Sequence, residues 1–534
     1  MLAAITLCGL ALRLCEAATQ PLWTDEALTL VLAKWPTLDL LLRPVDPTAG
    51  LYYVLHQLFV PDEAGLVAIR GISIVAGTLS IPGIYAVARL GIGRSSGLLA
   101  AALLAISPVL VDYSQEARAY ALQLFLVLVS AAALLGWTRR LGKGGGTGAL
   151  MLFACSTVLA FSTHLSGSFW VVPAVPLSAW AAFRYGTPAQ RRTYLIALAA
   201  MAGGALPELI RLVWRAYLGG GFVWLDQAGT AAALATWSET LLPIGGLIAT
   251  PLAQLLFLAV LLLLIWRLYA HREGLRAWMT ESPVAAAVIG ILLFAPLLVW
   301  LFGFVVVPIF MPRTILMGVA GFILLICLVD RFEKRPFVRA AAVLAFALAL
   351  SSSGTVRVKE AAAPRRPGRS TGNRLPGECR SPAPPARSAR PGDVILHCAS
   401  WKYPPFRHAV RQIEGVPNVV LLDWRMVRFD DFGLSGSDWE RTYFRSMLEP
   451  PMRYLMGQKT RLPIRETTLE PFQRAWVVES ECGEEGQARS REWLGRGRYT
   501  LAGLSSSTPH HSGIRVWLFE PDGAATRRVY SVTN

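Results

Sequence analysis

The chain has 534 residues, of which 54% are hydrophobic and only 16% are charged, and its mean hydropathy is +0.45. Roughly a quarter of the residues in a soluble globular protein are charged, so this composition excludes a soluble globule and predicts a polytopic membrane protein. The formal net charge of +16 does not indicate nucleic-acid binding, because the excess Lys and Arg fall in loops expected to anchor the membrane domain and in a C-terminal tail.

Eleven apolar stretches are long enough, or nearly so, to cross a bilayer as helices. Fifteen Lys and Arg fall in one set of alternate loops and six in the other, so the positive-inside rule places the first set in the cytoplasm. We therefore expect a mainly α, multi-pass bundle in the cytoplasmic membrane, whose first loop and C-terminal tail face outward. The stretches are at about 3–19, 66–88, 97–111, 119–137, 149–163, 167–183, 193–209, 249–266, 281–303, 315–329 and 338–352.

The start of the chain lies inside its first hydrophobic stretch. It shows neither a basic n-region nor a cleavage site of small residues. We expect an uncleaved first span, with a misassigned start as the alternative.

Composition divides the chain into three parts. Residues 1–352 are expected to form the membrane domain, whose most elaborate loop is at about 20–65, and 353–392 form an Arg/Pro-rich linker. Residues 393–534 are expected to form a small outward-facing α/β domain. Its strand-like runs are at 393–397, 418–424, 476–479 and 514–519, and it contains helix-compatible stretches such as 487–494. It has no P-loop and no G-x-G-x-x-G, so nucleotide chemistry is not predicted.

Two adjacent carboxylates, Asp25 and Glu26, follow the first hydrophobic stretch in Leu-Trp-Thr-Asp-Glu-Ala. One interpretation is structural: Thr24 or Asp25 caps a short interfacial helix, where acids in the first turn contribute about 0.3–1 kcal/mol. The other interpretation is catalytic, and it depends on which other polar residues share the outward side.

Further polar residues do fall on that side. Each has a structural interpretation, since loop acids are usually solvated, an interfacial Arg can reach the headgroups, and a lone His is often structural. Their joint occurrence on one face favours a site. They are Asp46 in Asp-Pro-Thr-Ala-Gly-Leu-Tyr-Tyr, which ends at Tyr53; Glu116, Arg118 and Tyr120 in Tyr-Ser-Gln-Glu-Ala-Arg-Ala-Tyr; His164; and Arg313. Arg13, inside the first span, either points to this site or pairs within the bundle; we favour the second.

These motifs resemble those of the polyprenyl-phosphate-dependent glycosyltransferases of the GT-C superfamily, especially the bacterial relatives of protein O-mannosyltransferases and of the lipid A aminoarabinose transferase. The resemblance covers about residues 20–125. It rests on Leu-Trp-x-Asp-Glu-Ala, on Asp-Pro followed by Leu-Tyr-Tyr, on Arg-x-x-Ser at 70–73, and on Ser-Pro followed by Tyr-Ser-Gln-Glu-Ala-Arg-x-Tyr. The chain departs from the family at 48–50, where Thr-Ala-Gly replaces a common Pro-Pro pair, and in its Arg/Pro-rich linker.

The resemblance implies a membrane enzyme that moves a hexose or pentose from a polyprenyl phosphate to a protein, lipid or glycan acceptor on the outer face of the membrane. In such an enzyme Asp25 is the general base, and a single displacement inverts the anomeric centre. Glu26 then orients the acceptor or helps to bind a cation.

The leaving group of this reaction is a lipid phosphate, whose growing negative charge needs fixed positive groups. Arg118 and Arg313 are the candidates, because guanidinium groups match phosphate oxygens in pairs. Glu116 is expected to hold Arg118. The remaining substrate-binding candidates are Asp46, Tyr53, Tyr120 and His164.

Three questions stay open at this level. No cofactor is certain, although Asp25, Glu26, Asp46, Glu116 and His164 could supply ligands to a divalent cation. A lipid flippase or transporter is the main competing function, although no internal repeat typical of transporters is visible. A non-catalytic subunit of an envelope-polysaccharide assembly complex is the other. Sugar, carrier length, acceptor and oligomeric state are not fixed by the sequence.

Overall fold

The computed structural model describes residues 1–15, 17–18, 24–33, 37–42, 49–61, 64–218, 228–241, 250–305 and 309–333, together with five strands between 393 and 521. The chain divides into two compact units. The first comprises Met1–Ala18 and Ala33–Val356, and the second comprises Thr19–Leu32 and Arg357–Asn534. The expected linker at 353–392 lies outside the described residues, so the three-part division stays a prediction.

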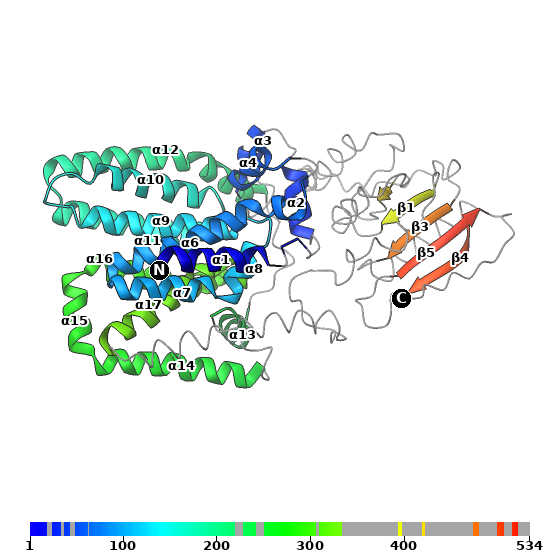
Figure 1. Cartoon of the computed structure of the whole chain (residues 1–534). Coiled ribbons are helices and arrows are strands. Elements are labelled where there is room, and N and C mark those ends of the chain that lie inside the picture. Colours follow the sequence, from blue (N-terminus) through cyan, green and yellow to red (C-terminus); the bar gives the residue numbers. More distant parts are fainter. Residues whose placement is uncertain are drawn as a thin grey trace. The chain divides into compact units, whose positions relative to one another are not determined.

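Every regular element described in the first unit is a helix (Figure 1). The helices are α1 (Leu2–Leu14), α3 (Thr37–Leu42), α4 (Gly50–Phe59), α5 (Leu66–Ile69), α6 (Gly71–Gly91), α7 (Arg94–Ala105), α8 (Pro108–Ser114), α9 (Tyr120–Thr138), α10 (Thr147–Phe161), α11 (Ser168–Tyr185), α12 (Pro188–Leu218), α13 (Thr230–Leu241), α14 (Thr250–Ala270), α15 (Arg272–Glu281), α16 (Pro283–Val305) and α17 (Leu316–Glu333). Two 3₁₀ turns, η1 (Leu165–Gly167) and η2 (Pro312–Thr314), precede α11 and α17.

Within the described residues, six helices are long and apolar enough to cross a membrane, or seven spans if α7 and α8 count as one bent span. This identifies a multi-pass membrane protein. Ten of the eleven predicted stretches overlap described helices, including the shorter apolar helices α1 and α10, whereas the stretch at 338–352 lies outside the described residues. The total of about 11 spans therefore stays a prediction.

The stretch at 97–111 is not one continuous helix. It breaks between α7 and α8, whose axes differ by 62°. Pro108 explains the break, because proline has no N–H to donate to Leu104 O and disfavours helical geometry at the residue before it. Ser107 accordingly has extended backbone, with φ −67° and ψ 117°.

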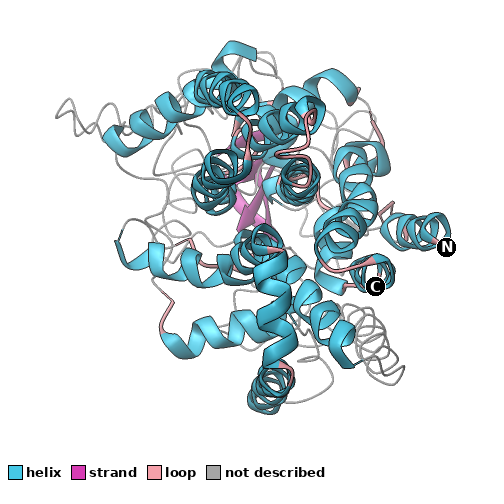
Figure 2. Cartoon of the chain, turned by 90° about the vertical axis from the view of Figure 1, so that its left-hand side faces the viewer, coloured by secondary structure: helices cyan, strands magenta, loops and turns pink. Residues whose placement is uncertain are grey.

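Helix α6 packs against α9, α7, α1 and α8. Helices α9, α10 and α12 run side by side, as Figure 1 shows, and Figure 2 views many of the helices nearly end on. Small and polar residues bring the helices together, as is usual in membranes. For example, Trp170 Nε1 donates to Ser130 Oγ over 2.9 Å, and Ser130 Oγ lies 2.7 Å from Thr157 Oγ1, which joins α11, α9 and α10.

The second unit contains α2 (Thr24–Leu32) and a five-stranded sheet. The strands are β1 (Asp393–His397), β2 (Val419–Leu421), β3 (Arg474–Glu479), β4 (Tyr499–Ser506) and β5 (Arg515–Pro521), in the order β2-β1-β3-β5-β4. β1 pairs in parallel with β2 and β3, whereas β5 pairs antiparallel with β3 and β4. Four strands coincide with predicted runs, while β4 was not predicted. The predicted helix-compatible stretches, such as 487–494, lie outside the described residues, so the α/β class stays a prediction.

Candidate functional site

The turn at 115–119, between α8 and α9, carries Arg118 into contact with α4 and α6. Arg118 donates from a terminal guanidinium nitrogen to Tyr53 Oη over 3.1 Å. Ser73 Oγ donates to Arg118 O over 2.9 Å, so its single proton is used and the Tyr52 hydroxyl, 2.8 Å away, must donate to it. All four residues are buried. These bonds bring together three motifs that are separate in the sequence.

Tyr120, the first residue of α9, is the common neighbour of the predicted site residues. The guanidinium carbons of Arg118 and Arg313 each lie 5.9 Å from the centroid of its ring. This is within the range of a cation–π interaction. The rings of His164 and Tyr113 lie 5.3 and 5.5 Å from it, both edge to face. Two cations and two rings therefore gather around one buried phenol.

The 3₁₀ turn η2 presents Arg313. Thr314 fixes the turn, because its hydroxyl lies 2.7 Å from Ile309 O and accepts from Met311 N over 3.2 Å. Arg313 Nε lies 2.8 Å from Met311 Sδ. Arg313 is only partly buried, whereas Arg118 is 3% exposed. The two guanidinium groups thus approach Tyr120 from different elements and with different access to their surroundings.

His164 is held by the turn that follows it. Ser166 donates its backbone N–H to His164 Nδ1 over 3.1 Å, so Nδ1 is an acceptor and the proton of the neutral ring lies on Nε2. Ser166 Oγ lies 2.8 Å from the same nitrogen and 2.9 Å from Gln123 Oε1 of α9. Ala49 N donates to Thr163 O over 3.1 Å, which brings the end of the first loop beside His164. With the proton on Nε2, that nitrogen is a hydrogen-bond donor.

Glu116 lies in the same turn as Arg118 and is 6% exposed. Arg118 N donates to Glu116 O over 2.7 Å, which closes the turn. Tyr113 interacts electrostatically with both Glu116 and Arg313. The expected ion pair between the Glu116 and Arg118 side chains stays a prediction.

Asp25 and Glu26 lie in the first turn of α2, in the second unit. Thr29 Oγ1 donates to Asp25 O over 3.1 Å, as within a regular helix. This position fits the structural interpretation, in which acids stabilise a helix N-terminus, and it leaves the catalytic interpretation untested. Asp46 lies outside the described residues. The sequence-predicted set is therefore brought together only in part, as Tyr53, Glu116, Arg118, Tyr120, His164 and Arg313.

No group of three or more His, Cys, Asp or Glu side chains in the described part of the chain is arranged to hold a metal ion. Of the five ligands considered for a divalent cation, Glu116 and His164 are described in the first unit. Metal binding thus stays an open alternative.

Sequence reasoning missed the supporting residues Gln115, Gln123 and Ser166, although Gln115 lies inside a recognised motif. Arg13 pairs within the bundle, as expected: it is fully buried and bonds to Ser114 Oγ over 3.1 Å and to Ala105 O over 3.2 Å.

No protein-family model and no curated protein matches the chain. Solved structures do. The structure of ArnT from Cupriavidus metallidurans in the apo state aligns with a TM-score of 0.56 at 12% identity, over 97% of each chain. The same protein bound to undecaprenyl phosphate aligns with a TM-score of 0.54 at 11% identity, again over 97% of each chain. An oligosaccharyltransferase from Archaeoglobus fulgidus gives a TM-score of 0.46 at 13% identity, over 96% of this chain and 73% of that one. The two ArnT alignments show that the chain shares the fold of that protein.

Proposed function

We propose that the chain is a membrane glycosyltransferase that moves a sugar from a polyprenyl phosphate to an acceptor on the outer face of the cytoplasmic membrane. The observation that carries the proposal is the pair of guanidinium groups, Arg118 and Arg313, that meets at Tyr120. The fold adds support, because ArnT from Cupriavidus metallidurans has the same fold and has been solved with undecaprenyl phosphate bound.

A phosphate explains why two arginines are placed together. An arginine inside a membrane protein costs about 2.5–3.5 kcal/mol at the bilayer centre, so it is retained for a partner or a function. Arg118 donates to the Tyr53 phenol, and both guanidinium groups flank Tyr120. Guanidinium groups bind phosphate oxygens in pairs, so two of them beside one ring suit the phosphate of a lipid-linked donor.

The proposed reaction is a single displacement. A nucleophilic oxygen or nitrogen of the acceptor attacks the anomeric carbon and loses its proton to Asp25, while the bond from the anomeric carbon to the phosphate oxygen breaks and its electrons leave with the polyprenyl phosphate. Arg118 and Arg313 stabilise the charge on that phosphate. Attack opposite the leaving group inverts the anomeric centre.

The remaining candidates bind and orient the substrates. His164 donates from Nε2, the nitrogen left to it by the Ser166 bond. Tyr53 and Glu116 hold Arg118, Glu26 orients the acceptor, and Asp46 contributes to substrate binding. The predicted outward-facing domain, at about 393–534, binds the acceptor.

Release of free polyprenyl phosphate in liposomes tests the proposal. The full chain is offered a panel of polyprenyl-phosphate sugars with a membrane extract as acceptor. Loss of a positioned general base costs about 10²–10⁴-fold in rate, which sets the expectation for Asp25→Asn. Arg118→Gln removes one stabilising cation and should cost about 10²-fold or more.

Two matched variants control for folding and for charge. Glu281→Gln and Arg276→Gln change exposed residues of α15 and should leave release unchanged. A chain that leaves every donor intact, yet moves the lipid between leaflets equally well with Asp25 or Asn, would be a flippase and not a transferase.

A further inference from the structure

The break between α7 and α8 leaves backbone carbonyls without their usual helical partners. Pro108 has no N–H for Leu104 O, and α8 starts a new set of hydrogen bonds with Val111 N donating to Ser107 O. Such carbonyls inside a membrane must find other donors, since each unsatisfied group costs several kcal/mol. Ser107 N donates to Leu104 O over 3.4 Å, and further donors come from another helix.

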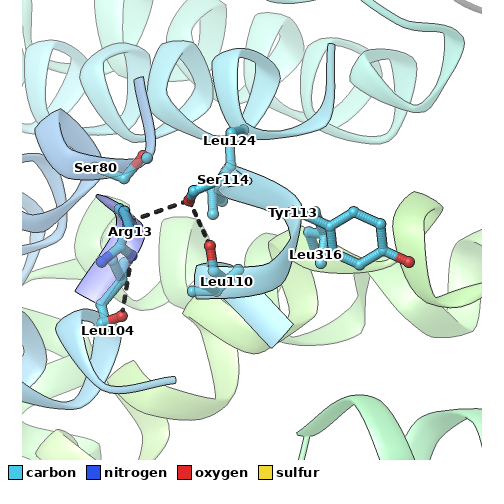
Figure 3. Close-up of a pocket in the computed structure, with 10 residues that line it drawn as sticks. Arg13, Ser80, Leu104, Leu110, Tyr113, Ser114, Leu124 and Leu316 are labelled. Atoms are coloured by element: carbon cyan, nitrogen blue, oxygen red, sulfur yellow. Dashed lines mark hydrogen bonds between the residues drawn. The ribbon is translucent and has the colours of Figure 1, made fainter. Parts of the chain in front are cut away.

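Arg13 of α1 supplies the donors on both sides of the break (Figure 3). One terminal guanidinium nitrogen donates to Ala105 O over 3.2 Å. The other reaches Leu104 O over 3.5 Å, and both carbonyls are at the end of α7. Nε donates to Ser114 Oγ, at the end of α8, over 3.1 Å. One buried side chain therefore spans the two arms of the 62° bend.

Gln115 donates hydrogen bonds in the opposite direction, to the end of α1. Its side-chain amide, one residue after α8, donates to Leu12 O and Arg13 O over 3.2 Å each, and also to Cys15 O. These are carbonyls of the last turn of α1 and its C-cap, which have no partners within that helix. Helix α1 thus binds both sides of the break, and the residue after α8 binds the end of α1.

We infer that Arg13 and Gln115, which together we term the α1–break lock, position the turn at 115–119 and through it Arg118. This inference rests on the proposed function only in naming the bound group as a lipid phosphate. Gln115 precedes Arg118 by three residues, and the backbone of Arg118 is then fixed by Ser73. Arg13 touches no substrate: it is a positioning residue that sets where the phosphate-binding guanidinium lies.

The lock has little room to rearrange. A Cβ added to Gly77 of α6 would lie 2.0 Å from Ser114 Oγ and 3.1 Å from Arg13 Nε. The cavity that Arg13, Ser80 and Ser114 help to line has a volume of about 10 Å³, which is room for about one water molecule. A displaced guanidinium group therefore has little room in this cavity, and we expect the loss of one bond of the lock to change the turn that follows.

Three variants of the full chain separate positioning from general stability. Ser114→Ala removes the acceptor of Arg13 Nε, and Arg13→Lys keeps the charge but loses the planar fork. Ser130→Ala is the matched control, because it also removes buried hydrogen bonds in the bundle, those to Trp170 and Thr157, away from the lock. Hydrogen exchange of the peptide covering 115–120, binding of polyprenyl phosphate and the thermal midpoint are measured for each.

The lock requires exchange of the 115–120 peptide to rise about tenfold in Ser114→Ala and Arg13→Lys, and polyprenyl phosphate to bind about tenfold more weakly. All three variants should lower the thermal midpoint by similar amounts. Ser130→Ala alone should leave the hydrogen exchange of the peptide and the binding of polyprenyl phosphate as in the wild type. If the 115–120 peptide exchanged at the same rate in all three variants, the inference that Arg13 and Gln115 position the turn would be wrong. If the wild-type chain binds no polyprenyl phosphate, the proposed function fails, while hydrogen exchange still decides whether Arg13 positions the turn.

Discussion

The protonation of His56 should make the stability of the first unit depend on pH. His56 lies on α4, outside the candidate membrane spans, and is 2% exposed. Burial lowers the pKa of its imidazole from 6.5 to about 4, opposed in part by the bond to Ile69 O. That bond, 3.3 Å long, needs a proton on Nε2, since a carbonyl oxygen only accepts. His56 therefore joins α4, which carries Tyr53, to the end of α5.

The sign and size of the effect follow from the two pKa values. Between pH 6.5 and 4 the unfolded chain binds a proton that the folded chain does not, so stability falls as the pH falls through this window. A difference of about 2.5 pH units corresponds to roughly 3.4 kcal/mol below the lower pKa, and to about 2 kcal/mol at pH 5. Above pH 6.5 the penalty is absent.

Thermal unfolding of the full chain in detergent, at about pH 7.5 and pH 5, measures the effect. The variant His56→Gln can still donate to Ile69 O but does not titrate. The wild type should lose about 2 kcal/mol more than the variant between the two pH values. Equal losses would refute the reasoning, because the acid sensitivity would then come from other groups.

Two further substitutions test the site and the packing. Tyr120→Phe keeps the ring that faces Arg118 and Arg313, so the affinity for the donor should change little. Tyr120→Leu removes the cation–π partner and should weaken donor binding by roughly 1–2 kcal/mol. Equal affinities for the two variants in a binding titration would contradict the role of the ring. Gly321→Ala places a Cβ 2.3 Å from Leu293 N in the α16–α17 contact and should lower the free energy of unfolding by about 1–3 kcal/mol. The control Gly290→Ala, whose added Cβ meets nothing within 4 Å, should not destabilise the protein. Denaturation midpoints of the two variants measure the difference.

The membrane spans were readable from the sequence because hydropathy is a local signal, and most of the predicted stretches overlap helices. The break at Ser107 was missed although its signal is present. A stretch of uniform hydropathy was read as one helix, whereas Pro108 removes a hydrogen bond that hydropathy does not register. Strand β4 was missed because Gly503 and small residues interrupt its alternation, and its register with β5 shifts between Leu501 and Gly503.

The sequence predicted the residues of the candidate site but not their contacts with one another. Glu116, Arg118 and Tyr120 are sequence neighbours, so one motif gave all three. That Tyr53 and Ser73 bind Arg118, or that Arg313 reaches Tyr120, depends on how α4, α6 and α17 pack, which periodicity does not specify. Arg13 shows the same limit, because the sequence allowed its side chain either to point to the site or to pair within the bundle. In the structure it pairs within the bundle, with the carbonyls at the Pro108 break.

The most direct test of the proposed transferase is acceptor-dependent release of free polyprenyl phosphate from a synthetic polyprenyl-phosphate sugar by the purified full chain in liposomes. We expect one donor of the panel to be consumed, with its sugar recovered on the acceptor in the inverted anomeric configuration. Recovery of every donor intact, with the chain folded and able to bind the lipid, would contradict the proposed function.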